Sequence, residues 1–320
     1  MLDDRAEQID LGLNAPVDIL PIRMIKRASS GYWGFLKRKP MGGIGGAIVF
    51  LAIVIAVFAP LIAPHDPQSI GVAQKFSSPS ADAPLGADQL GRDILSRLIY
   101  GARISMYVGV VSVVIGISIG CAVGIVSGYA GGKSDILVQR LVDALMGFPP
   151  IILALGLMAA LGASMNNVVI ALVAILIPGA TRVIRSQVLS IKEMDYVLAA
   201  RSIGASSPRI MLRHIAPNVA ATYIVLMTIT LGFAIVVEAS LSFLGVGVPP
   251  DVATWGSMLE IARRYIDTQA WLPIFPGLAI AAVVFGVNFL GDALRDVMDP
   301  RLRGRSETSL FPFVGHLVRN

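Results

Sequence analysis

The sequence predicts an all-α integral membrane protein with six transmembrane helices, and three observations support this fold class. Hydrophobic residues make up 55% of the 320-residue chain and charged residues only 15%. The mean hydropathy is +0.74, a balance with which a soluble domain would dissolve poorly. Long uncharged runs alternate with short basic segments, as in membrane spans joined by loops. The net charge of +5 therefore reflects membrane topology, and we expect no nucleic-acid partner.

Residues 1–40 are predicted to form a cytoplasmic N-terminal segment, because they are polar and basic and precede an apolar run. That run, residues 41–64, carries no charge. It is long enough to cross a bilayer and too long for a signal-peptide core. We therefore expect an uncleaved first transmembrane helix.

Residues 65–103 are predicted to form an extracytoplasmic connector. Its second half, 88–103, places apolar residues on one helical stripe, with Arg92, Asp93 and Arg97 off that stripe. This pattern is typical of an amphipathic helix lying at the outer membrane surface. A simple lead-in turn to the next span is the alternative.

Residues 104–292 are predicted to form a core of five further transmembrane helices, and residues 293–320 a cytoplasmic tail. The helices are expected at 104–132, from near Ser134 with a bend at Pro149 and Pro150, at 168–186 with a kink at Pro178 and Gly179, at 218–244 and at 273–292. Trp255 and Trp271, between the last two spans, suit a membrane-surface segment with aromatic anchors.

One predicted span carries a glycine stripe. Gly116, Gly120, Gly124 and Gly128 recur every four residues, so one helix face is bare backbone suited to close helix packing. Packing inside the subunit and packing against a partner would give the same pattern.

The distribution of Lys and Arg predicts the orientation of the chain in the membrane. Of the 26 such residues, 20 lie in segments that this topology places inside and 6 in segments that it places outside. The positive-inside rule therefore predicts cytoplasmic N- and C-termini and a cytoplasmic loop at 190–217. This fits a multi-pass protein of a bacterial inner membrane.

The loop at 190–217 is predicted to contain two short helices joined by a corner. Gly204 suits a left-handed helix cap, and Ser207 followed by Pro208 suits an N-cap with proline at the first helical position. Pro217 is expected to end the second helix. Small side chains at Ala199, Ala200 and Gly204 would let another protein approach the backbone closely.

This loop resembles the EAA loop of membrane subunits of ABC-type importers, in the spacing of Ala199, Ala200, Gly204 and Pro217. In that family the loop docks into a groove of an ATP-hydrolysing subunit. The resemblance implies docking residues, with Tyr196 as an aromatic anchor and Arg201 as a rim charge. The implied set is Asp195, Tyr196, Ala199, Ala200, Arg201, Ile203, Gly204 and Pro217. Leu198 replaces the acidic residue of the family pattern, which removes the salt bridge that this residue would make.

Four further stretches are similar to C-type permeases of the dipeptide, oligopeptide and nickel importers. They begin at Pro84, Glu238, Trp255 and Asn288. The resemblance implies a type I ABC importer core (MetI-like) with an extra N-terminal helix. It also implies a B-type permease partner, two ATPase subunits that use ATP and Mg, and an extracytoplasmic solute-binding protein. The substrate stays open among dipeptides, oligopeptides, nickel, glutathione and opines.

No catalytic constellation is found in the sequence. It contains no GxxxxGK[ST] phosphate loop, so ATP hydrolysis is expected only in partner subunits. Cys121 is the single cysteine, and the three histidines are scattered, so we expect no metal site and no bound cofactor. An ion-coupled secondary transporter is the alternative class, but no internal repeat supports it. An intramembrane enzyme would need a polar catalytic set within the spans.

Two acidic positions leave a choice open. Glu238 lies near the outer end of a predicted span, as a candidate pathway or gate residue or as a structural carboxylate hydrogen-bonded to Ser240 or Ser242. Asp143, beside Arg140, suits a solvated ion pair or a contact with an ATPase subunit.

Overall fold

The computed structural model describes residues 40–298, and within this range it contains helices and no strands. The helices are α2 (Pro40–Val57), α3 (Ala59–Ile62), α4 (Ile94–Ala130), α5 (Gly132–Met146), α6 (Pro150–Leu161), α7 (Met165–Ile191), α8 (Asp195–Ser202), α9 (Ser207–Ile210), a π-helical turn (Met211–Ile215), α10 (Ala216–Phe243), α11 (Trp255–Arg264) and α12 (Ile274–Met298). The cytoplasmic segment predicted at 1–39 and the tail from 299 lie outside the described residues.

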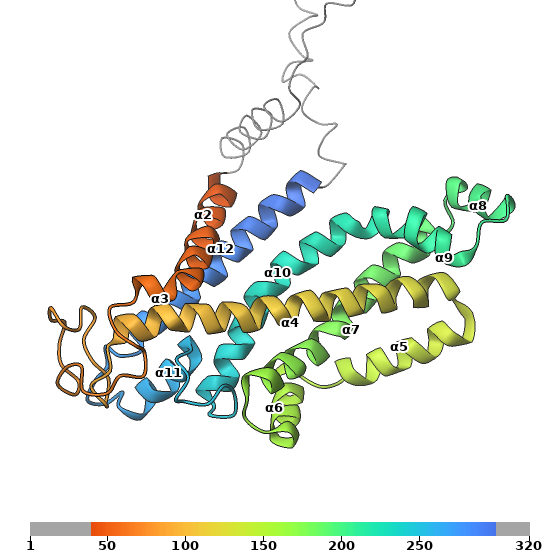
Figure 1. The fold of residues 1–320 in the computed structure, drawn as a ribbon. Helices are drawn as coiled ribbons and strands as arrows, with labels where there is room; N and C mark the ends of the chain where they lie inside the picture. The colour runs from red at the N-terminus through yellow and green to blue at the C-terminus, as the bar shows by residue number, and fades with distance from the viewer. Residues whose placement is uncertain (1–39, 299–320) are drawn as a thin grey trace, which may run out of the picture. The chain divides into compact units, whose positions relative to one another are not determined.

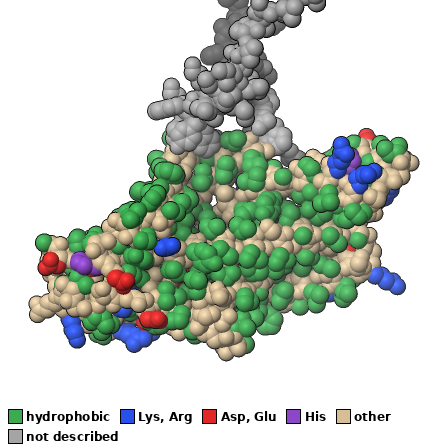
Figure 2. All heavy atoms as spheres, in the orientation of Figure 1, with side chains coloured by type: hydrophobic (Ala, Val, Ile, Leu, Met, Phe, Trp, Pro, Cys, Tyr) green, Lys and Arg blue, Asp and Glu red, His purple; other side chains and the backbone are tan. Residues whose placement is uncertain are grey.

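Five helices are long and apolar enough to cross a membrane, or six if the bent pair α5–α6 counts as one span. The other spans are α2, α4, α7, the continuous stretch α9–α10, and α12. Figure 2 shows hydrophobic side chains over the middle of the visible face, with charged side chains gathered toward its two ends. One end carries α8 and α9 and is called the loop end; the other carries residues 63–93 and is called the connector end (Figure 1).

The prediction of a separate amphipathic helix at 88–103 is wrong, because α4 begins at Ile94 and runs unbroken to Ala130. Asp93 is its N-cap and accepts hydrogen bonds from the backbone N–H groups of Leu95 and Ser96. Arg97, predicted to lie off the apolar stripe, is 1% exposed. Its Nη1 donates to the carbonyl of Pro67 at 3.1 Å, and its Nε lies 3.7 Å from the Asp88 carboxylate. The connector therefore encloses the first turns of α4.

The four stripe glycines of α4 all face α7, so their close packing is inside the subunit. A Cβ built on Gly120 would lie 2.6 Å from the Ala180 Cβ and 2.8 Å from the Ile177 carbonyl oxygen. Gly124 approaches the backbone of Thr181 as closely. Only bare backbone permits this separation of the two helices.

The third predicted span is broken at the expected position, but by a right-angled bend. Helices α5 and α6 meet at 89°, with the break at residues 147–149 and Pro150 opening α6. Helix α5 begins at Gly132, after the N-cap position Gly131. Ser134 was expected near the helix start as an N-cap, but its hydroxyl donates to the Gly131 carbonyl from inside the first turn.

Pro217 was predicted to end the second loop helix, and this prediction is wrong. The chain runs from α9 through the π-helical turn into α10, and Pro217 lies in the first turn of α10. In the π turn the N–H of Ala216 donates to the Met211 carbonyl, one residue further back than in an α-helix. This wider turn relieves the clash between a proline ring and the preceding carbonyls. The N-cap position before α9 is Ser206, not Ser207, and no side-chain cap bond forms there.

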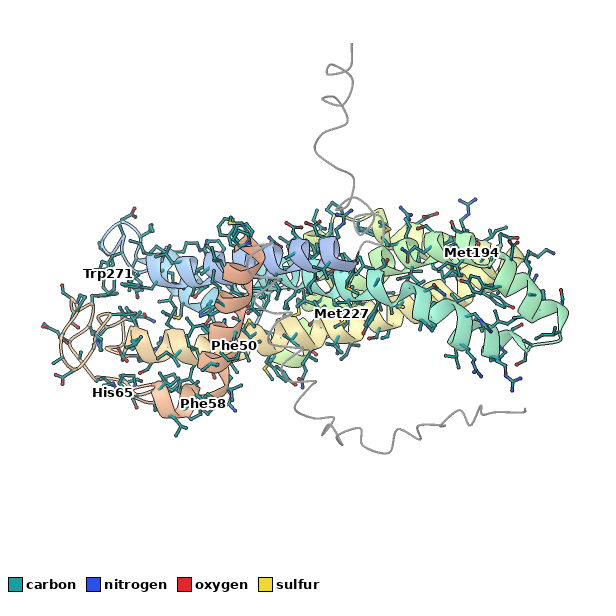
Figure 3. All side chains as sticks on the ribbon, turned by 90° about the horizontal axis from the view of Figure 1, so that it is seen from above. Phe50, Phe58, His65, Met194, Met227 and Trp271 are labelled. Carbon is teal, nitrogen blue, oxygen red and sulfur yellow. The ribbon has the colours of Figure 1, made fainter. Side chains whose placement is uncertain are left out.

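Trp255 is a buried packing residue, and the prediction of a surface anchor is wrong for it. It is 3% exposed, and its indole N–H donates to the Leu98 carbonyl on α4 at 3.0 Å. Thr254 and Ser257 form a capping box that fixes the start of α11. Trp271 and His65 lie at the connector end, Met194 lies at the loop end, and Met227 lies between them (Figure 3).

Candidate functional site

The loop-end corner between α8 and α9 is built by a Schellman motif. Gly204 adopts φ +83°, which a side chain would disfavour. The N–H of Ala205 donates to the Ala200 carbonyl, and the N–H of Gly204 donates to the Arg201 carbonyl, both at 3.0 Å. These two bonds satisfy the last carbonyls of α8 and fix the direction in which the chain leaves it. The predicted glycine cap is therefore present.

The inner face of the corner is seated on the transmembrane helices. Val197 and Ala200 of α8 pack in one hydrophobic cluster with the end of α7 and the start of α10. The other buried members are Ile184, Val188, Ile191, Ile210, Ile215 and Val219. Ala200 is 7% exposed, so its small side chain serves packing within the subunit. Of the three small residues expected to face a partner, Ala199 and Gly204 remain accessible.

Arg201 and Tyr196 differ from each other in their surroundings. The Arg201 guanidinium lies 5.8 Å from the ring centroid of Tyr129 on α4, a cation–π contact that ties α8 to the end of α4. Tyr196 is 41% exposed, and its hydroxyl accepts a hydrogen bond from the Asn218 amide at 3.1 Å. Both side chains are exposed at the loop end, and each also contacts a residue of the subunit itself.

The outer face of the loop carries exposed large apolar side chains. Ile203 is 87% exposed and Leu212 74%. Together with Met194, Tyr196 and Leu198 they form what we call the loop patch: Met194, Tyr196, Leu198, Ile203 and Leu212. Lys and Arg side chains gather at the same end (Figure 2). Sequence reasoning missed Met194, Leu198 and Leu212 as docking residues; Met194 lies between Glu193 and Asp195, which was an available signal.

The remaining loop candidates lie at its two ends. Asp195 is exposed in the first turn of α8, next to the positive end of the helix dipole. Pro217 is exposed at the start of α10. The structure therefore gathers the predicted loop residues at one end of the helices, but it divides them between an outer and an inner face.

Glu238 is fully enclosed within the subunit. Its carboxylate is 0% exposed, and Oε1 accepts a hydrogen bond from the Ser242 hydroxyl at 3.0 Å. Oε2 has no partner among the residues that the structure describes. Ser240 bonds instead to the Val236 carbonyl. A passing solute cannot contact Glu238 in this conformation, so the geometry matches the structural alternative with Ser242 as the partner.

The family model for the inner membrane component of binding-protein-dependent transport systems matches residues 120–304, more than half of the chain. The chain belongs to this family. A second model, for the N-terminal transmembrane domain of oligopeptide transport permease C, matches residues 31–80. As a permease of this family, the chain is a membrane subunit of an ABC importer, and the alternative of an ion-coupled secondary transporter is excluded.

Curated relatives match most of the permease. A putative peptide transport system permease of Brucella suis is 41% identical over 84% of this chain and 90% of its own. A dipeptide transport system permease of Alkalihalophilus pseudofirmus is 38% identical over 84% and 88%. A glutathione transport system permease of Escherichia coli is 40% identical over 85% and 90%.

A solved structure has the same fold as the permease. The MetNI methionine ABC transporter in an inward-facing conformation matches with a TM-score of 0.53 at 19% identity, over 63% of this chain and 96% of that one. The type I importer (MetI-like) fold predicted from the sequence is therefore confirmed. No group of three or more potential metal ligands occurs within residues 40–298.

Proposed function

We propose that this chain is the C-type permease subunit of an ATP-driven importer for peptides, and that it forms half of the solute pathway. The named transport functions of the relatives, for peptides, a dipeptide and glutathione, support a peptide-like substrate. Because glutathione is itself a short peptide derivative, it is the second candidate substrate.

The loop patch is the observation that supports coupling to an ATPase subunit. An exposed apolar group of this kind indicates a protein contact, since water-facing surfaces rarely gather large apolar side chains. The patch stands on α8 and the start of the α9–α10 stretch, and the buried side of the corner is packed against α7. A partner that moves the patch therefore moves two transmembrane helices with it.

The proposed assembly has four kinds of component. A homologous B-type permease forms the other half of the pathway, and two ATP-binding subunits dock at the loop end. An extracytoplasmic solute-binding protein delivers the solute at the connector end. ATP and Mg belong to the ATP-binding subunits, and this chain binds no cofactor. Both termini are cytoplasmic in this arrangement, within a bacterial inner membrane.

The test of coupling is the variant Ile203→Asp. Ile203 is the most exposed member of the loop patch, and its side chain is not needed for the Schellman motif, whereas a change at Gly204 would also strain the backbone. A charge at a central apolar contact costs more than about 1 kcal/mol, which corresponds to at least roughly fivefold weaker binding. We expect the purified complex to lose its ATPase subunits and its solute-stimulated ATP hydrolysis.

The matched control is Ile70→Asp, since Ile70 is 70% exposed but lies in the connector. This variant should retain the ATPase subunits. Normal ATPase recovery and normal uptake with Ile203→Asp would contradict docking through the loop patch. Uptake of labelled dialanine, with and without excess glutathione, distinguishes the two candidate substrates.

A further inference from the structure

Two ion pairs join α5 to α7, and the carboxylate of the first is buried, while its arginine side chain is 27% exposed. Arg185 donates through Nε to Asp135 Oδ1 at 2.7 Å and through Nη2 to Oδ2 at 2.5 Å. Ser127 of α4 also donates to this carboxylate, and the Asp135 side chain is 9% exposed. The first pair thus has its hydrogen bonds within the subunit and holds three helices together.

The second pair is open. Arg182 Nη2 contacts Asp143 Oδ1, and the two side chains are 50% and 51% exposed. Asp143 therefore pairs across helices with α7, and the prediction of a pair with Arg140 on its own helix does not describe it. Each partner keeps polar atoms that face out of the subunit.

The open pair lies within two candidate membrane spans, α7 and the bent pair α5–α6. The nine residues from Arg182 to the end of α7 at Ile191 rise about 14 Å, and the eleven residues from Gly132 to Asp143 rise about 16 Å. Both side chains therefore lie at a similar distance from the loop end, inside helices α5 and α7, which lie side by side (Figure 1).

A half-exposed ion pair at this depth is incompatible with a lipid-facing surface. Charged side chains within membrane segments face a bundle interior or a water-filled cavity. Gly179, one turn before Arg182 on α7, has nothing within 4 Å of the position of a Cβ, so the backbone beside the pair is also open to approach. The open side of the pair therefore faces water or another protein.

We propose that Arg182 and Asp143 line the solute pathway and bind the two charged ends of a zwitterionic solute as it passes. The inference rests on the proposed function. Arg182 binds the carboxylate, for which the planar guanidinium is suited, and Asp143 binds the ammonium group. The protein pair separates as the solute pairs form, so no charge is left without a partner at membrane depth. The solute leaves when the protein pair closes again.

Cys121 is the only cysteine in the sequence, so one substitution gives a cysteine-free parent for labelling. In a Cys121→Ala parent within the complete transporter, Asp143→Cys and Arg182→Cys are treated with a positively charged, membrane-impermeant thiol reagent, with and without dialanine. Ser186→Cys is a milder reporter that keeps the ion pair, since Ser186 is exposed one turn beyond Arg182. Leu137→Cys is the control, an apolar position of α5 that is 65% exposed.

We expect all three test positions to react. Dialanine should slow the reaction of Ser186→Cys, which keeps both binding side chains, about tenfold, and Leu137→Cys should remain unlabelled, as expected of a lipid-facing position. Absence of labelling at all three test positions would overturn the inference, and so would labelling of Ser186→Cys that dialanine does not slow. ATP-driven uptake of dialanine by the parent tests the proposed function separately. Uptake with an unreactive pair overturns this inference alone, whereas loss of uptake by the parent with normal ATP hydrolysis overturns the proposed substrate.

Discussion

Glu238 is a carboxylate in an apolar setting, and its packing explains what a substitution there would do. It lies on α10, where the neighbouring Ala239 and Ser242 contact Gly256 of α11 so closely that a Cβ on Gly256 would approach within 2.6 Å. Buried polar groups are costly unless they are hydrogen-bonded, and the Ser242 hydroxyl supplies one bond. The residue therefore supports this contact through its hydrogen bond to Ser242.

The variants Glu238→Gln and Glu238→Ala should separate charge from hydrogen bonding. Glutamine keeps an acceptor for Ser242, so we expect normal uptake and normal thermal stability of the purified complex. Alanine leaves the Ser242 hydroxyl without its partner and should lower the free energy of unfolding by about 1–3 kcal/mol. Loss of uptake by a stable, assembled Glu238→Gln complex would show instead that the charge itself is used.

At the scale of the element, the contact between α4 and α7 depends on the absence of side chains along one stripe. Gly120 occupies its tightest position, opposite Ala180. A methyl group there must either displace α7 or distort both helices, because neither contacting atom belongs to a flexible side chain.

Gly120→Ala should therefore destabilise the permease by about 1–3 kcal/mol. The matched control is Gly156→Ala in α6, where nothing lies within 4 Å of the added Cβ. Thermal unfolding in detergent, followed for both variants beside the parent, tests the difference. Equal stability of Gly120→Ala and Gly156→Ala would contradict the packing described for α4 and α7.

The sequence predicted the transmembrane helices, the break at Pro149 and Pro150, and the glycine corner at Gly204, because uncharged runs, proline pairs and a left-handed cap are local signals. It did not predict the continuation through Pro217, because the π-helical turn that accommodates the proline has no signature of its own. Arg97 was expected outside the core, whereas it is buried. Its hydrogen-bond partner, the Pro67 carbonyl, lies thirty positions away in the sequence. Tertiary partners of this kind cannot be inferred from periodicity.

For the loop, sequence reasoning identified the segment but not the direction of each side chain. Ala200 and Arg201 both matched a docking motif, yet one is buried against α7 and α10 and the other lies over Tyr129. Which face of a short helix points inward depends on how the corner is seated. That seat is formed by residues distant in sequence.

At the scale of the whole molecule, the long apolar helices predict that the loop end and the connector end lie on opposite sides of the membrane. Lys and Arg residues are concentrated in segments assigned to the loop side, which predicts that this side is cytoplasmic. Each end also carries an exposed isoleucine, Ile203 at the loop end and Ile70 at the connector end.

Orientation can be measured with Ile70→Cys and Ile203→Cys in the Cys121→Ala parent. A membrane-impermeant thiol reagent should label Ile70→Cys in cells with a permeable outer envelope and intact inner membrane. Ile203→Cys should be labelled only in inverted membrane vesicles. The reverse pattern would contradict the predicted orientation.

The unbroken path from Ser207 to Phe243 has a mechanical consequence. Its 37 residues extend over about 55 Å. A rotation of the whole stretch by about 5° about the loop end would displace the far end by about 5 Å. The far end carries Glu238 and leads into the segment before α11. The helix is thus a lever, and a small rotation imposed at the corner would be amplified into a large displacement on the opposite side of the membrane.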